Sequence, residues 1–164
     1  MKPQKLLVIV AIVCVLLGLS VGVAMAEGCP GGLIQGETFP GDLRITDDSC
    51  TIIGSTIQGS LRIINSDYVV LLNNRVGGNL RVDGNEGGDG VANVIANTVF
   101  GKRLVVRDMG AANVIENETI TGNIRVIRNV SALVEKNISA QDLICNNTDT
   151  DAFFNFAEGT LSCE

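Results

Sequence analysis

Arginine is the residue type with the clearest chemical potential in this chain. It recurs at one station of a repeated segment, directly after the first aliphatic residue: Arg44, Arg62, Arg81 and Arg125. Because side chains alternate along a β-strand, these arginines should point outward while the aliphatic residues beside them point inward. Like charges stacked at strand spacing repel one another unless acids or a bound anion intervene. The column therefore suggests a face that binds anions, such as an acidic polysaccharide of the cell envelope or the extracellular space. Val105 and Ile144 interrupt the column, and the alternative is a solvated face that resists aggregation.

A second candidate site is an oxygen-rich segment near the carboxyl end. Interpreted as a twelve-residue calcium loop, it places side-chain oxygens at five stations: Asn147, Asp149, Asp151, Asn155 and Glu158. Asparagine replaces the usual first aspartate and Ala152 replaces the turn-forming glycine, so the pattern is an incomplete calcium loop. The alternative is an acidic cap loop above phenylalanines that plug the carboxyl end of the core: Phe153, Phe154 and Phe156.

The cysteines beyond residue 26 fall in two pairs, one near each end: Cys29 with Cys50, and Cys145 with Cys163. The members of each pair are about one repeat apart. Neighbouring parallel strands lie roughly 4.8 Å apart, which is within the Cα range of a disulfide. We therefore expect two disulfides, each tying a terminal coil to its neighbour. Cysteines at opposite ends of a rod could not converge on one metal ion.

Composition argues against catalysis and against nucleic acid as a partner. The chain has no histidine and no tryptophan, and its net charge of −6 repels nucleic acid. Polysaccharide-active β-helix enzymes use carboxylates, basic residues and calcium on one outer face. The short repeats here leave little room for the inserted loops of such a cleft. We expect a protein that is not an enzyme, with a polysaccharide-active β-helix enzyme as an alternative.

The first 26 residues indicate export. Lys2 and Lys5 precede an uncharged apolar run over 6–23, and Ala24-Met25-Ala26 supplies the small residues that signal peptidase requires. We expect a signal peptide over 1–26 and a mature chain over 27–164, secreted or at the cell surface. Cleavage removes two lysines, so 10 basic and 18 acidic residues remain, a net charge of −8. The alternative is an uncleaved membrane anchor, because the run is just long enough to span a bilayer.

One repeated phrase positions all of these residues: a glycine, one or two spacers, an aliphatic residue, a polar residue and a second aliphatic residue. It begins at Gly41, Gly59, Gly78, Gly101, Gly122 and Gly159. A period of roughly 20 residues with β-type alternation is typical of a solenoid whose coils bury their apolar faces by stacking. We predict an all-β fold: a single-stranded right-handed parallel β-helix of about six coils, in one domain over 27–164.

Alignment on the glycine predicts four inward columns of aliphatic residues. Two lie on the strand after the glycine: Leu43/Leu61/Leu80/Leu104/Ile124/Leu143 and Ile45/Ile63/Val82/Val106/Val126/Cys145. Two precede the next glycine: Ile53/Leu72/Ile95/Ile115/Val134 and Ile57/Val76/Val99/Ile120/Ile138. Equivalent residues of stacked coils lie above one another, so the columns should form a narrow aliphatic core. The glycine-rich stretch 84–90 falls between columns and predicts a loop at one corner.

Asparagines recur between the columns, at two stations: Asn74, Asn97 and Asn117 at one, and Asn65, Asn85, Asn129 and Asn147 at the other. Amides can hydrogen-bond up a column, and asparagine tolerates the left-handed backbone of a turn, so we expect turn-forming ladders. Four asparagines begin glycosylation sequons and would accept glycans in a host that modifies them: Asn117, Asn129, Asn137 and Asn146.

The whole mature chain resembles a group of small exported repeat proteins, common in bacteria, with G-N-x-x-V and G-N-T-V-G-G-N-L phrases. The closest match is Asn74-Arg-Val-Gly-Gly-Asn-Leu80. Gly36-Glu-Thr-Phe-Pro-Gly41 with Cys29 and Cys50 is similar to the cysteine-bearing first coil of that group, and Cys145 with Cys163 to its closing pair. The resemblance implies a fold and export, and no activity. Bactofilin-like polymer-forming β-helices share the rhythm but lack paired end cysteines.

The expected protein is therefore a discrete, monomeric rod, since stapled ends and a negative surface both disfavour end-to-end association. Its expected role is that of an exported structural or adhesive surface module. An anion- or polysaccharide-binding module that uses the arginine column is the alternative.

Overall fold

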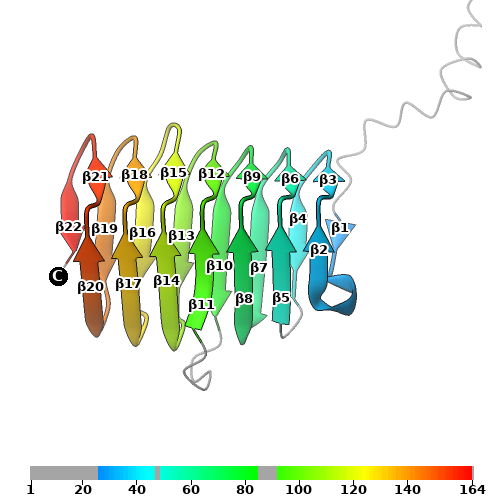
Figure 1. The fold of residues 1–164 in the computed structure, drawn as a ribbon, viewed down its shortest axis with the longest axis horizontal. Coiled ribbons are helices and arrows are strands. Elements are labelled where there is room, and N and C mark those ends of the chain that lie inside the picture. Colours follow the sequence, from blue (N-terminus) through cyan, green and yellow to red (C-terminus); the bar gives the residue numbers. More distant parts are fainter. Residues whose placement is uncertain (1–25, 47–48, 85–91, 164) are drawn as a thin grey trace, which may run out of the picture.

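The computed structural model describes residues 26–46, 49–84 and 92–163. Of the signal peptide expected over 1–26, residues 1–25 lie outside the described residues, as do residues 85–90 of the loop expected over 84–90, Asn85 among them. Ala26 begins β1 and Gly84 ends β10. Each coil contributes one strand to each of three parallel sheets, and Figure 1 shows the coils side by side in chain order. The predicted all-β parallel solenoid of about six coils is confirmed. Strands β1 to β3, with a short 3-10 turn (η1, Pro30–Gly32), form a further coil at the amino end.

Each of the three sheets contains every third strand along the chain. Sheet A holds β1 (Ala26–Glu27), β4 (Leu43–Ile45), β7 (Leu61–Ser66), β10 (Leu80–Gly84), β13 (Leu104–Arg107), β16 (Ile124–Ile127), β19 (Leu143–Asn146) and β22 (Leu161–Cys163). Sheet B holds β2 (Leu33–Gln35), β5 (Ser49–Ile53), β8 (Tyr68–Leu72), β11 (Ala92–Ala96), β14 (Ala111–Ile115), β17 (Ser131–Glu135) and β20 (Asp149–Phe153). Sheet C holds β3 (Thr38–Phe39), β6 (Thr56–Ile57), β9 (Arg75–Val76), β12 (Val99–Phe100), β15 (Glu118–Thr119), β18 (Ile138–Ser139) and β21 (Phe156–Ala157).

In sheet A the predicted columns are confirmed. Strand pairing aligns Leu43 with Leu61 and Leu80, and the line continues through Leu104 to Leu143. None of these residues is more than 1% exposed. The second column, from Ile45 to Cys145, is buried as well. On most of these strands a polar residue separates the two aliphatic residues, which leaves only one face that can be buried; Val105 and Ile144 are the exceptions, and pairing with the neighbouring coils sets their strands in the same register.

In sheets B and C the predicted columns are partly wrong, by one residue. Ile95, Val134, Ile57 and Val76 were placed correctly, but the buried residues elsewhere are the neighbours of those predicted: Ile52, Leu71, Val114, Phe100, Thr119 and Ser139. Sheet B adds a second inward column that includes Cys50, Val69, Ala112 and Ala132. A shift of one residue exchanges the two faces of a strand. Apolar doublets such as Ile52-Ile53 and Leu71-Leu72 conceal that shift in the sequence.

The asparagines have two separate roles, in adjacent positions. Asn73 and Asn97 have positive φ angles of 56° and 50° at the corner between sheets B and C, and Asn65 has a φ of 57° at the corner between sheets A and B. The residues that follow the corner between sheets B and C form a buried ladder. In this ladder each side-chain oxygen accepts a hydrogen bond from a backbone N–H of the previous coil: Ser55 to Asn74, Thr98 to Asn117, Asn117 to Asn137 and Asn137 to Asn155. A second ladder links Met109, Asn129 and Asn147. The expected ladders are confirmed for Asn74, Asn117, Asn129 and Asn147, whereas Asn97 and Asn65 lie at corners and Thr98 takes the ladder position beside Asn97.

Burial in the ladders changes the interpretation of the sequons. Asn117, Asn129 and Asn137 are at most 1% exposed, so their amides cannot accept a glycan in the folded protein. Of the four sequon asparagines, Asn146 alone lies on the surface.

Both ends carry the expected disulfides. Cys29 joins Cys50 with a Cα–Cα distance of 5.8 Å, and Cys145 joins Cys163 with a Cα–Cα distance of 4.3 Å. The interpretation of the carboxyl-terminal phenylalanines as a core plug is wrong. Phe153, Phe154 and Phe156 are 50%, 84% and 58% exposed. The inward positions of the last coil belong to Ala152 and Ala157, which align with Val134 and Ser139.

Candidate functional site

The outer face of sheet A carries the arginine column. Strand pairing places Arg44 beside Arg62 and Arg62 beside Arg81, followed by Val105, Arg125 and Ile144. Each arginine lies between two buried aliphatic residues, as Arg62 lies between Leu61 and Ile63, so the alternation of the strand directs it outward. The structure thus brings together the arginines that the sequence predicted.

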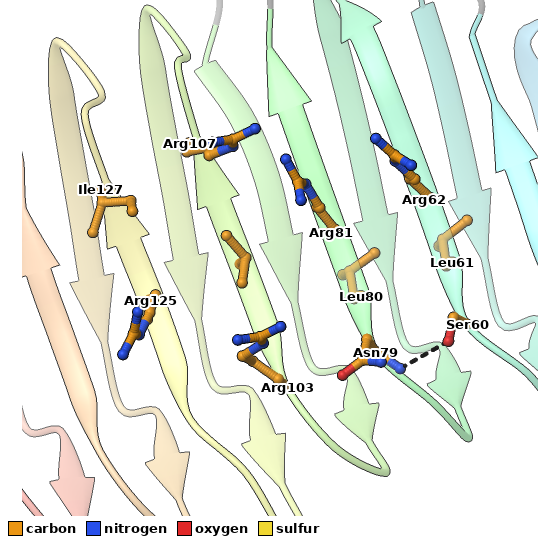
Figure 2. A pocket seen from close by; sticks show the side chains of 11 residues that line it. Ser60, Leu61, Arg62, Asn79, Leu80, Arg81, Arg103, Arg107, Arg125 and Ile127 are labelled. Atoms are coloured by element: carbon orange, nitrogen blue, oxygen red, sulfur yellow. Dashed lines mark hydrogen bonds between the residues drawn. The ribbon is translucent and has the colours of Figure 1, made fainter.

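Two further arginines complete this face where Val105 interrupts the column. Arg103 and Arg107 lie two residues to either side of Val105 and therefore point to the same side of sheet A. Together with Arg62, Arg81 and Arg125 they line a shallow depression of about 370 Å³, which we call the arginine groove (Figure 2). Spacing by two around Val105 was the signal in the sequence. The station directly after the first aliphatic residue does not include these two positions, so the arginine column predicted from that station lacks them.

One carboxylate organises the upper part of the groove. Asp83 accepts a hydrogen bond of 2.7 Å from Nε of Arg81 and another from Nε of Arg107. Burial raises the pKa of Asp83, but the hydrogen bonds and charges of Arg107 and Arg81 outweigh burial, so its pKa lies below the ordinary value of 3.8. The neighbouring Asp108 pairs with Arg107 and Arg128. Arg81 and Arg107 are therefore held in fixed positions at strand spacing.

The remaining arginines of this face have no ion pair within the described residues. Among the described residues, Arg44, Arg62, Arg103 and Arg125 have no carboxylate within ion-pair distance. The Nε atom of Arg125 is buried and has no hydrogen-bond partner in the described part of the chain. Two like charges at 4 Å repel by roughly 1 kcal/mol even in bulk water. A multivalent anion in the groove would remove this repulsion and satisfy the free guanidinium donors.

This positive face belongs to an acidic protein. Seven of the 10 basic residues beyond residue 26 lie in or directly beside the strands of sheet A: Arg44, Arg62, Arg81, Arg103, Arg107, Arg125 and Arg128. Guanidinium groups donate paired hydrogen bonds to carboxylate, sulfate and phosphate. The concentration of charge on one face is the property that distinguishes the site chemically.

No family model, curated protein or solved structure matches this chain. The chemistry of the site is therefore inferred from its own residues.

The residues of the candidate calcium loop are not gathered into one site. The segment forms an ordinary coil in which β20 and β21 are joined at a corner. The side-chain oxygens of Asn147 and Asn155 accept hydrogen bonds from Asn129 and Asn137, at the ends of the two ladders. Asp149, Asp151 and Glu158 are exposed. Over residues 26–46, 49–84 and 92–163, no three acidic, histidine or cysteine side chains are grouped to hold a metal ion.

In the same described ranges, no helix is long and apolar enough to cross a membrane.

Proposed function

We propose that this protein is an exported, non-enzymatic surface module that binds an acidic polysaccharide along the arginine groove. The observation that carries the proposal is the arginine groove on one face of an acidic protein, in which Arg62, Arg103 and Arg125 have no acidic partner among the described residues, while Arg81 and Arg107 share Asp83. An extended polysaccharide with one carboxylate or sulfate per sugar presents a matching linear series of anions. Parallel strands about 4.8 Å apart supply roughly one cationic station per coil.

Several features support the proposed compartment and mechanism. The two disulfides are compatible with a location outside the cytoplasm, and they agree with the proposal that residues 1–26 are a cleaved signal peptide. We include right-handed coiling in the same proposal, because connections between parallel strands are generally right-handed. The carboxylates beside the groove, Asp83 and Asp108, are both held in ion pairs with arginines, which suits a binding surface better than acid–base catalysis.

The test is binding of polygalacturonate, compared with neutral dextran, to residues 27–164 over a series of salt concentrations. We expect binding to polygalacturonate alone, with an affinity that falls steeply with salt. The double variant Arg62→Ser/Arg125→Ser should weaken binding by about tenfold or more, because neither lost charge has an acidic partner in the described part of the chain. Arg62→Lys/Arg125→Lys should bind more tightly than the double serine variant and less tightly than the native protein, since lysine keeps the charge but cannot form the paired hydrogen bonds.

Arg75→Ser is the matched control, because Arg75 is an exposed arginine on sheet C. Equal losses in Arg75→Ser and Arg62→Ser/Arg125→Ser would mean that net charge, and not the groove, attracts the polymer. Equal binding of dextran and polygalacturonate would refute the proposal as well.

A further inference from the structure

The last coil carries an exposed apolar patch that the proposed function does not use. Phe153 ends β20, Phe154 forms the corner and Phe156 begins β21, and each is at least half exposed. Ile138 of the preceding coil aligns with Phe156 and is 49% exposed. We call these residues, Phe153, Phe154, Phe156 and Ile138, the phenylalanine patch. It lies on the corner between sheets B and C, away from the arginine groove on sheet A.

The backbone at Phe154 is unusual for so large a residue. Its φ is 55°, in the left-handed region that bulky side chains avoid. The equivalent corner positions of the earlier coils carry smaller or polar residues: Gly36, Gly54, Asn73, Asn97, Glu116 and Lys136. Phe154 is also 84% exposed, so it gains little from packing. A strained aromatic side chain without core contacts destabilises the fold, which points to a role outside the fold.

Acidic residues border the phenylalanine patch, and the cation beside it, Lys136 of the preceding corner, is paired with Glu116 and Glu135. Asp151 precedes Phe153 by two residues on the same strand face, Glu158 follows β21, and Glu118 pairs in register with Ile138. All three are exposed, and none has a cationic partner among the described residues. An apolar surface with an anionic rim is complementary to apolar side chains flanked by lysine or arginine. The same rim repels anionic lipid, and it would face itself in a symmetric contact between two copies.

We propose that the phenylalanine patch is a docking site for a cationic amphipathic segment of a partner protein. The phenylalanines supply the buried anchors of the contact, and Asp151, Glu158 and Glu118 supply the polar rim that selects basic partners. This inference is independent of the arginine groove, so either proposal can fail without the other.

The probe is an amphipathic helical peptide of leucine and lysine. Two control peptides test its features: in one, glutamate replaces lysine, and in the other, serine replaces leucine. Binding to residues 27–164 is measured by calorimetry. We expect the leucine–lysine peptide alone to bind. Phe153→Ser/Phe154→Asn/Phe156→Ser should weaken it by about tenfold or more, and Asp151→Asn/Glu158→Gln should weaken it by less and flatten its salt dependence. Arg62→Ser/Arg125→Ser should leave it unchanged.

The single variant Phe154→Asn separates binding from folding. It should raise the midpoint of urea unfolding, because asparagine accepts the left-handed backbone, and it should still weaken peptide binding. Several results would overturn the proposal. They are equal binding of the glutamate or serine peptide, unchanged binding by the triple variant, and self-association or capture by phosphatidylcholine vesicles that the triple variant abolishes. Self-association would assign the patch to a second copy of this protein, and capture by vesicles would assign it to a lipid surface.

Discussion

Removal of one ladder amide should be among the most costly single substitutions in this protein. Asn137 is fully buried. Its side-chain oxygen accepts hydrogen bonds of 3.0 Å from both the backbone N–H and the side-chain amide of Asn117. Its side-chain amide donates to the carbonyl of Val114 at 2.7 Å and to Oδ1 of Asn155 at 3.1 Å. Asn137 therefore connects the coils on both sides of its own.

Asn137→Ala leaves the N–H of Asn117 and the carbonyl of Val114 without this partner, in the interior. A buried polar group without a partner costs about 1–3 kcal/mol, so we expect a loss of about 2–5 kcal/mol in the free energy of unfolding. The assay is urea unfolding followed by circular dichroism, with an unchanged m-value. This loss is large beside a typical total of about 5–15 kcal/mol.

Asn146→Ala is the matched control, because Asn146 is an exposed asparagine of β19. Its change should stay within about 0.5 kcal/mol. If Asn137→Ala costs no more than Asn146→Ala, then the ladder contributes nothing to stability and the reasoning from buried amides is refuted.

Other predictions concern the core register, the ion pairs and the last corner. Val114→Asp should abolish folding and Ile115→Asp should be tolerated, as judged by circular dichroism, because Val114 is buried and Ile115 is partly exposed; equal effects would contradict the register of sheet B. The lowered pKa of Asp83 stabilises the fold above its ordinary value of 3.8, and this contribution is lost as pH falls through the folded pKa. Acid unfolding of Asp83→Asn should therefore depend less steeply on pH below about 3.8 than that of the native protein; parallel curves would show that the ion pairs add no stability. Phe154→Asn should stabilise the protein by about 1 kcal/mol in urea, through relief of left-handed strain; a loss of stability would mean that Phe154 packs in solution.

The fold was predictable from the sequence where one polar residue separates two aliphatic residues. In Leu61-Arg62-Ile63 only one face can be buried, so the columns and the arginine face of sheet A followed directly. At Val114-Ile115 both residues are apolar, and only hydrogen bonding to the neighbouring coils decides which one points inward. Alternation therefore predicts which residues point inward only where a polar residue marks the outward face of the strand.

The candidate sites were predictable only in part, because their decisive contacts join different coils. The oxygens of Asn147 and Asn155 fit a calcium loop by spacing, yet asparagines about one coil earlier already occupy them. Phe154 was assigned to the core because it is apolar, whereas Ala152 and Ala157 take the inward positions of that coil. Spacing along the chain does not reveal which atoms the preceding coil has already engaged.

The burial of sequon amides in the ladders has a practical consequence for recombinant production. A secretory pathway that attaches oligosaccharides while the polypeptide is emerging would reach Asn117, Asn129 and Asn137 before the coils close over them. A glycosylated amide could not then enter its ladder, so such a cell line should deliver misfolded, retained material. Bacterial periplasmic expression, or conversion of the sequon hydroxyl residues Thr119, Ser131 and Ser139 to alanine or valine, avoids the modification. Of these three, Ser131 is the safest to change, because the buried hydroxyls of Thr119 and Ser139 donate hydrogen bonds to the carbonyls of Gly122 and Asp142.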